Sequence, residues 1–141
     1  MTFENPNLDE ISALLLKVKH IAVVGLSPKP NRPSHQVASA MQAFGYRIFP
    51  VRPAVDEVLG EKAYADLRDL PEPVDLVDVF RAPEHVEPIV DACIERKIPF
   101  LWLQDGVVNE SAARRARAAG ITVVMDRCIY RDYLALHASD G

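Results

Sequence analysis

Two kinds of segment recur along the chain: short continuous apolar runs, and longer stretches whose apolar residues return at helical spacing. Continuous runs predict strands buried on both faces, and helical spacing predicts amphipathic helices. The predicted strands cover 20–24, 46–51, 74–80, 98–103 and 121–125, with a short extra strand at 62–64. The predicted helices cover 9–19, 34–44, part of 81–96, 109–119 and 127–136, with a helical turn at 66–70.

One proline leaves a boundary open. Pro88 falls inside the helical pattern of 81–96, so this helix begins either near Glu87 or at Pro83 with a kink.

The order of these segments predicts the fold class. Strands and helices alternate, which calls for a mainly parallel five-stranded sheet with right-handed crossovers and helices on both faces. This is an α/β, doubly wound Rossmann-type fold. The sequence has no linker or repeat, so we expect a single domain over residues 1–141. In such a fold the ligand crevice lies at the carboxyl ends of the strands.

The stretch Ile21–Ser34, IAVVGLSPKPNRPS, joins the first strand to the first large helix. Gly25 ends the apolar run, and a loop rich in proline and cations follows. Ser34 is the expected N-cap of a helix that starts at His35. The first backbone N–H groups of a helix lack partners and attract anions. We therefore expect a phosphate-bearing ligand here.

This loop lacks the glycines of a dinucleotide fingerprint. A G-x-G-x-x-G motif from Gly25 needs two further glycines that are absent. Arg52 ends the second strand, where NAD-binding folds place an acid against the ribose hydroxyls. A cation there suits an extra ribose phosphate, such as those of NADP or coenzyme A (CoA); the alternative is a solvated turn residue. Lys29 and Arg32 add positive charge that could contact phosphate. The alternative is that they belong to a surface loop stiffened by its prolines.

Composition narrows the function classes. Hydrophobic residues make up 49% of the 141 residues, enough for a packed core, and the net charge of −4 disfavours general nucleic-acid binding. No apolar run approaches the ~20 residues of a membrane span. An acidic N-terminus and two cysteines indicate the cytoplasm rather than secretion. We expect a cytoplasmic protein with a small-molecule ligand and no nucleic-acid or membrane partner.

Residues with catalytic chemistry form no recognisable constellation. The histidines lack metal-ligand spacing, and no nucleophile elbow or Walker loop occurs. Asp75 and Asp78 lie three apart in a predicted strand and therefore face opposite sides. A buried, ionised Asp78 needs a backbone N–H or a cation as partner. His35 is expected to be structural rather than a phosphate donor.

Several long motifs carry a resemblance. They are VVGLSPKPNRPSHQVA from Val23, GYRIFPVRP from Gly45, LGEKAYADL from Leu59, PEPVDLVDVFRAPE from Pro71, LWLQDGVVNE from Leu101 and VMDRC from Val124. Over about 14–136 the chain resembles the small stand-alone CoA-binding proteins, whose domain is similar to the N-terminal CoA-binding domain of the succinyl-CoA synthetase α subunit. The resemblance implies CoA lying across the carboxyl edge of the sheet. It implies ligand contacts at Gly25, Leu26, Ser27, Lys29, Val51, Arg52, Pro53, Phe80, Arg81, Gln104 and Gly106, and the loop cation Arg32 joins them.

Two positions depart from the family pattern. Arg52 stands where the family often has asparagine, and Asp105 where it has an apolar residue. Arg52 would strengthen phosphate binding, whereas Asp105 would weaken it if it faced inward. The synthetase also relies on a second domain with a phosphorylated histidine and on a partner subunit. The sequence ends before such a domain, so we expect no ligase activity.

The sequence thus predicts non-catalytic binding of CoA or acyl-CoA, in the role of a CoA sensor or carrier. The alternatives are an NADP-dependent reductase and a regulatory nucleotide-binding module that acts through a protein partner. The adenosine bisphosphate is expected at 25–29 and Arg52, and the pantetheine arm past Phe80 and Gln104.

The two cysteines are expected to differ. Cys128 opens the last helix, where the helix dipole favours a thiolate, so it is expected to be the more reactive thiol and to trap CoA as a mixed disulfide. The alternative for Cys128 is a buried small hydrophobe. Cys93 lies on the core face of its helix and is expected to be inert.

Overall fold

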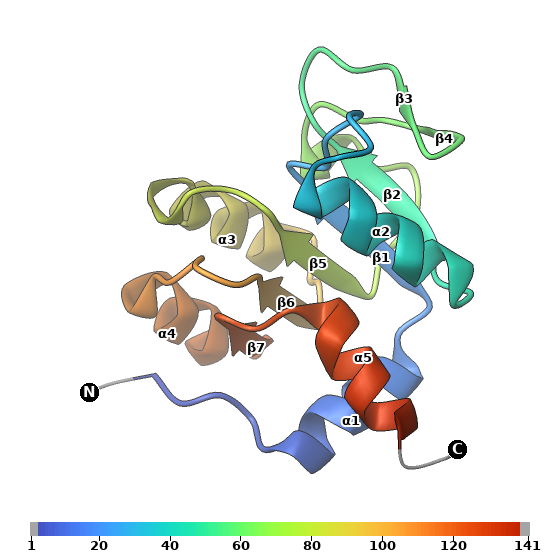
Figure 1. Ribbon diagram of the computed structural model, residues 1–141. Helices are drawn as coiled ribbons and strands as arrows, with labels where there is room; N and C mark the ends of the chain where they lie inside the picture. Colours follow the sequence, from blue (N-terminus) through green and yellow to red (C-terminus); the bar gives the residue numbers. More distant parts are fainter. Residues whose placement is uncertain (1–2, 139–141) are drawn as a thin grey trace.

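The computed structural model of the protein describes residues 3–138. Within them, five parallel strands form one sheet in the order β2-β1-β5-β6-β7 (Figure 1). These strands are β1 (His20–Val24), β2 (Arg47–Val51), β5 (Leu76–Val79), β6 (Phe100–Leu103) and β7 (Thr122–Met125). The doubly wound α/β fold is therefore confirmed.

The segment after β2 differs from the prediction. Instead of a strand at 62–64, a small antiparallel hairpin forms from β3 (Glu57–Val58) and β4 (Glu61–Lys62). Tyr64 makes only an isolated parallel bridge to Val51, because its backbone pairs with Pro50 and Arg52 at the open edge of β2.

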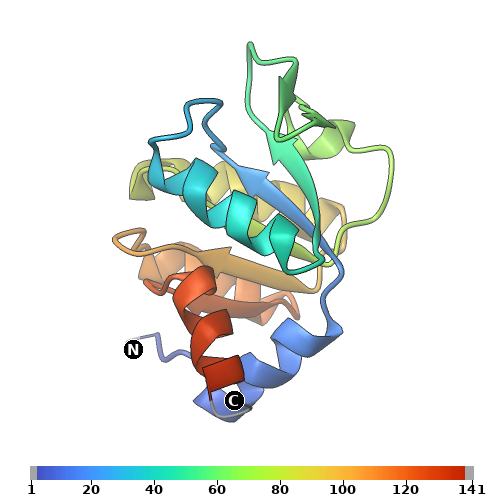
Figure 2. The same cartoon turned by 45° about the vertical axis from the view of Figure 1, so that its right-hand side comes forward.

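Helices cover both faces of the sheet. They are α1 (Leu8–Lys17), α2 (Pro33–Ala43), α3 (Val86–Glu95), α4 (Glu110–Ala118) and α5 (Ile129–Ala138), with 3-10 turns η1 (Leu67–Asp69) and η2 (Pro83–His85). Helices α1, α2 and α5 lie on one face, and α3 and α4 on the other (Figures 1 and 2). No helix within residues 3–138 has both the length and the apolar character needed to cross a bilayer.

Strand β1 is buried on both sides, as its apolar run predicts. Ile21 and Val23 pack toward α1, α2 and α5, and Ala22 and Val24 pack toward α3 and α4. Alternate residues therefore serve two separate cores, which fixes the register of the central strand.

Helix α2 begins two residues earlier than a Ser34 N-cap predicts. Pro33 is its first residue and Arg32 its N-cap, with no side-chain capping bond. Proline suits the first helical position because its fixed φ is helical and its missing N–H needs no partner there. The Ser34 hydroxyl instead accepts a hydrogen bond from the Ser27 N–H at 3.0 Å.

Of the two alternatives left by Pro88, the structure agrees with a helix that begins near Glu87. The turn η2 begins at Pro83, and the α-helix proper begins at Val86. Pro88 then lies in the first turn of α3, where no intrahelical N–H bond is lost.

The two aspartates near β5 have different environments. Asp75 precedes the strand, and its carboxylate accepts from the N–H groups of Lys19 and His20, both at 2.9 Å. Asp78 lies inside β5, opposite Val23 and Trp102, and is 1% exposed. The expectation that Asp78 finds a donor is wrong, because Asp78 Oδ1 has no partner among the described residues. Burial raises the pKa of Asp78 well above its ordinary value, so the core holds the neutral acid.

The chain changes direction at the boundary between β1 and β5. From β1 it turns to β2 on one side and then returns to β5 on the other, which makes this boundary the topological switch point. Gly25 follows β1 and has a φ of 85°, and a Cβ on it would lie 2.4 Å from the Phe80 carbonyl oxygen. Glycine is therefore required both for the turn and for the close approach of two backbones.

Candidate functional site

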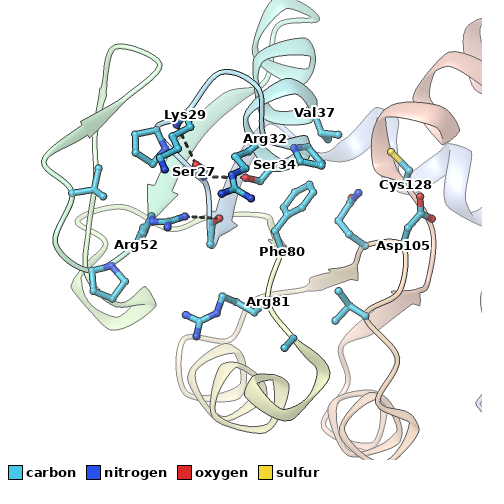
Figure 3. A pocket seen from close by; sticks show the side chains of 18 of the residues that line it. Ser27, Lys29, Arg32, Ser34, Val37, Arg52, Phe80, Arg81, Asp105 and Cys128 are labelled. Atoms are coloured by element: carbon cyan, nitrogen blue, oxygen red, sulfur yellow. Dashed lines mark hydrogen bonds between the residues drawn. The ribbon is translucent and has the colours of Figure 1, made fainter.

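A pocket of about 970 Å³ opens at the carboxyl edge of the sheet, over the switch point (Figure 3). Its walls come from the loops after β1, β2, β5 and β6 and from the N-terminal ends of α2 and α5. Since these loops end adjacent parallel strands, the fold brings together residues that are far apart in the sequence.

Most of the predicted site residues line this pocket. They are Gly25, Ser27, Lys29, Arg32, Arg52, Pro53, Phe80, Arg81, Gln104 and the reactive-thiol candidate Cys128. Their common feature is a position just after a strand or at a helix start.

Three predicted site residues do not line the pocket. Leu26 is fully buried in the core beneath the loop, and Val51 is the last buried residue of β2. The backbone N–H of Gly106 donates to Asp126 Oδ1 at 2.7 Å, so this glycine serves a turn. All three lie at or just after the end of a strand. Leu26 and Val51 bury their side chains in the core, however, and Gly106 uses its N–H in a turn.

The sequence reasoning missed several apolar and small lining residues. These are Pro33, Ser34, Val37, Ala54, Val55 and Val107. Ala54 has a φ of 62°. The sequence gives no sign of this conformation, because residues other than glycine rarely adopt it. Val37 could have been found from the sequence, since its spacing places it one turn into α2, near the helix start that faces the pocket.

Hydrogen bonds hold the first loop in shape. The Ser27 hydroxyl accepts from the Lys29 N–H at 3.1 Å, while the Ser27 N–H donates to the Ser34 hydroxyl. The His35 ring lies with Nδ1 2.9 Å from the Ser27 carbonyl oxygen. A carbonyl oxygen only accepts, so Nδ1 carries the proton. His35 therefore has the structural role predicted for it.

The first turn of α2 faces this loop without a side-chain cap. Its N-cap, Arg32, makes no capping bond, and Pro33 has no N–H. The backbone N–H groups at the start of a helix form the positive end of its dipole, which favours a negative charge placed against them. The helix start therefore adds to the positive potential of the pocket.

Four cationic side chains line the pocket: Lys29, Arg32, Arg52 and Arg81. In the described part of the chain, none of them forms an ion pair with a carboxylate. The Arg52 guanidinium donates to the Gly25 carbonyl oxygen at 3.3 Å.

Several arginines away from the pocket form ion pairs with carboxylates. Arg47 pairs with Glu72, Arg115 with Glu87 and Asp91, and Arg127 with Asp132. A chain with net charge −4 thus leaves unpaired cations at one pocket, and such a cluster attracts an anion.

Asp105 is the one carboxylate among the lining residues. Its Oδ1 accepts from Arg131 at 2.8 Å. The repulsion expected between Asp105 and an anionic ligand is therefore weakened, because the neighbouring guanidinium offsets the charge of the carboxylate.

The pocket changes character along its length. Lys29 and Arg52 lie on one side, near the ends of β1 and β2, and Cys128 and Asp105 lie on the other, with Phe80 between (Figure 3). Gln104 adds neutral surface on the side of Cys128, because its Oε1 accepts from the Ile129 N–H. A ligand with a polyanionic end and a neutral arm matches this arrangement.

A smaller cavity of about 260 Å³ lies toward η1 and α3. Pro53 and Arg81 line both cavities, so the two adjoin at the ends of β2 and β5. The small cavity also has Asp66, Arg68 and His85 in its wall.

Comparisons with known proteins agree with this geometry. Residues 19–133 match the family described as CoA binding domain. The chain is 45% identical over 126 residues to an uncharacterized protein, YneT, of Bacillus subtilis, covering 89% of this chain and 93% of that one. The solved structure of cell-free ID.343 from Thermus thermophilus has a TM-score of 0.89 at 38% identity, covering 93% of this chain and 99% of that one.

Part of the chain is also similar to a much longer enzyme. It is 32% identical over 85 residues to the ADP-forming 4-hydroxybutyrate–CoA ligase of Nitrosopumilus maritimus, covering 60% of this chain and 12% of the ligase. With the family match spanning the crevice from β1 to α5, this chain belongs to the CoA-binding domain family.

Proposed function

We propose that this protein binds CoA or an acyl-CoA in the crevice over β1 and β5 and does not turn it over. Family membership supports CoA as the ligand, and the shape and charge of the pocket support this crevice as its place.

The observation that carries the proposal is the set of unpaired cations. CoA has a 5′-diphosphate and a 3′-phosphate at one end. Lys29, Arg32, Arg52 and Arg81 offer ammonium and guanidinium donors without competing carboxylates among the described residues. Charge-assisted hydrogen bonds of this kind are the strong ones in proteins.

The change from cationic to neutral residues along the pocket supports one orientation of the ligand. The diphosphate lies against the 27–32 loop and the start of α2, and the 3′-phosphate lies at Arg52. The neutral pantetheine arm then runs past Phe80 and Gln104 toward Cys128. The reverse orientation would leave the phosphates beside Asp105 and the cations without charge partners.

The lining residues favour binding over catalysis. No histidine is among them, and their one carboxylate, Asp105, is held by Arg131. The described pocket therefore lacks a nucleophile–base pair of the kind that acyl transfer needs. A sensor or carrier role fits this chemistry, and pull-down with and without CoA would identify a partner that reads the bound state.

Thermal unfolding with a panel of nucleotides tests the proposal. A ligand that binds only the native state at a hundredfold excess over its Kd stabilises by about 2.7 kcal/mol. We expect CoA to raise the Tm clearly, NAD to leave it unchanged, and NADP to fall well short of CoA. An equal rise with NAD and CoA, or a larger rise with NADP, would contradict the assignment.

A further inference from the structure

Cys128 occupies a distinctive place at the neutral end of the pocket. Its carbonyl accepts from the Asp132 N–H at 3.0 Å, which makes Cys128 the residue that precedes and caps α5. Its side chain lines the pocket and is 8% exposed. Its sulfur lies on the side away from Lys29 and Arg52 (Figure 3).

The turn that carries Cys128 is held firmly. The Asp126 carboxylate accepts from the Gly106 N–H at 2.7 Å, and the Arg127 carbonyl accepts from Trp102 Nε1 at 2.8 Å. Arg127 also pairs with Asp132 in the first turn of α5, at 2.7 Å. The thiol is therefore presented to the pocket by a fixed backbone.

A second buried polar group points to a ligand at the same end. Gln104 is 4% exposed, and its Oε1 accepts from the Ile129 N–H at 3.1 Å, next to Cys128. Its Nε2 has no hydrogen-bond partner among the described residues. Because Gln104 lines the pocket and this nitrogen is not enclosed by the protein, its N–H groups reach the pocket. An amide donor placed there fits an amide carbonyl of a pantetheine arm.

Cys128 precedes the first turn of α5 and lies near two ion-paired side chains. The start of α5 supplies the positive end of a helix dipole. Arg131, on α5, is held by Asp105 at 2.8 Å, and this hydrogen bond is the chief cause that raises the pKa of Arg131. Asp132 is paired with Arg127, and Asp126 accepts from the Gly106 N–H.

Cys93 provides an internal contrast. It is fully buried between α3 and the sheet, and burial raises the pKa of its thiol to about 12. It lines neither cavity. A reagent guided by the pocket therefore reaches Cys128 and not Cys93.

We propose that Cys128 undergoes thiol–disulfide exchange with the disulfide form of CoA and holds one CoA as a mixed disulfide in the pocket. The proposal rests on the proposed CoA site and adds a covalent, redox-dependent state to it. The Cys128 thiolate attacks one sulfur of the CoA disulfide, a new S–S bond forms, and the original S–S bond breaks. The departing CoA thiolate takes up a proton in place of the one that Cys128 released. The CoA disulfide is the oxidant, and a free thiol reverses the step.

The test uses the full chain, freed of reductant, with two disulfides in parallel. One is CoA disulfide, and the other is pantethine, which has the same disulfide and arm but no nucleotide. We expect a mass increase of one CoA less two hydrogens, reversible by dithiothreitol and mapped to Cys128. CoA disulfide should react roughly tenfold faster or more, because binding raises its effective concentration. Cys93 should stay unmodified, and Cys128→Ser, checked for an unchanged fold by circular dichroism, should form no adduct.

Equal rates with the two disulfides, an adduct on Cys93, or no adduct would overturn the proposal. Calorimetry of CoA binding to the fully reduced protein separates this failure from failure of the CoA site. Binding to the reduced protein without selective exchange overturns only the covalent step. Absence of that binding, together with equal exchange rates, overturns both.

Discussion

Arg52 links two of the loops that form the pocket. It directly follows β2, and its guanidinium donates to the carbonyl oxygen of Gly25, which follows β1. Its remaining N–H groups are available to a ligand phosphate. This position beside the ribose of a bound nucleotide makes Arg52 the best candidate for the 3′-phosphate of CoA.

We expect Arg52→Ala to weaken binding of CoA more than binding of dephospho-CoA, which lacks only the 3′-phosphate. A well-formed charge-assisted pair contributes about 1.5–3 kcal/mol, so the selective loss should be roughly tenfold to a hundredfold. Calorimetry with both ligands measures it. Lys29→Ala and Arg32→Ala serve as matched controls that should weaken both ligands alike. An Arg52→Ala protein that keeps the wild-type preference for CoA would refute this role.

Asp78 makes the stability of the protein depend on pH. Its pKa is raised in the folded protein, so the native state keeps a proton that the unfolded chain releases above its ordinary pKa of about 3.9. The contribution is fully present below that pH and is lost as pH rises toward the raised pKa. Each pH unit in that window costs about 1.4 kcal/mol of unfolding free energy.

Asp78→Asn removes this titration. We expect the unfolding free energy of the wild type to fall relative to that of Asp78→Asn as the pH rises from about 4 to 7. Urea unfolding of both proteins across that range measures the difference, in which the other titrating groups cancel. Parallel pH profiles would mean that Asp78 is not held neutral.

At the scale of elements, β1, its glycine turn and α2 form the unit that creates the pocket. Gly25 lets the Phe80 backbone pass closely, and the Ser27–Ser34 bond ties the loop to the helix. The unit is therefore ordered before any ligand binds, which reduces the entropy lost on binding.

Gly25→Ala tests the close approach of the two backbones, with Gly60→Ala as control. Both glycines have positive φ, but a Cβ on Gly60 meets nothing within 4 Å, whereas one on Gly25 lies 2.4 Å from the Phe80 carbonyl oxygen. We expect Gly60→Ala to cost about 1–2 kcal/mol for its backbone conformation. Gly25→Ala should cost at least about 2 kcal/mol more, since the clash forces β1 and β5 apart. Equal losses in urea unfolding would show that the contact is not tight.

The elements were largely predictable because their patterns are strong. Continuous apolar runs located all five strands of the main sheet, and Asn109 caps α4 as its side chain allows. Ser34 was misread because serine is a good N-cap in general, while the preceding Pro33 fixes an earlier start. Asp78 was misread because a sequence does not reveal which neighbours a strand register will supply.

The pocket was predictable only in part, for a related reason. Residues just after a strand could be assigned to the crevice, but whether each side chain points in or out depends on loop geometry. Leu26 turns into the core, while Ser27 beside it lines the pocket. The neutral wall from Val37, Val55 and Val107 arises only once helix α2 and two separate loops are brought together.

At the scale of the whole molecule, the distribution of charge matters more than its sum. The chain carries a net charge of −4, and its surface arginines are largely paired, while the cations at the edge over the switch point have no carboxylate partner within residues 3–138. The fold supplies the geometry, and loop residues supply the specificity within it. This edge of the sheet is therefore the proposed place for the phosphates of CoA.

Calorimetric titration of CoA into the reduced protein, the Arg32→Ala/Arg81→Ala double variant and the Arg114→Ala control tests that claim most directly. Arg32 and Arg81 line the pocket from two different loops, whereas Arg114 lies on α4, outside it. We predict one CoA per wild-type chain, unchanged affinity in the control, and an affinity roughly a hundredfold lower in the double variant. No binding to the wild type, or equal affinity in the double variant, would contradict the account.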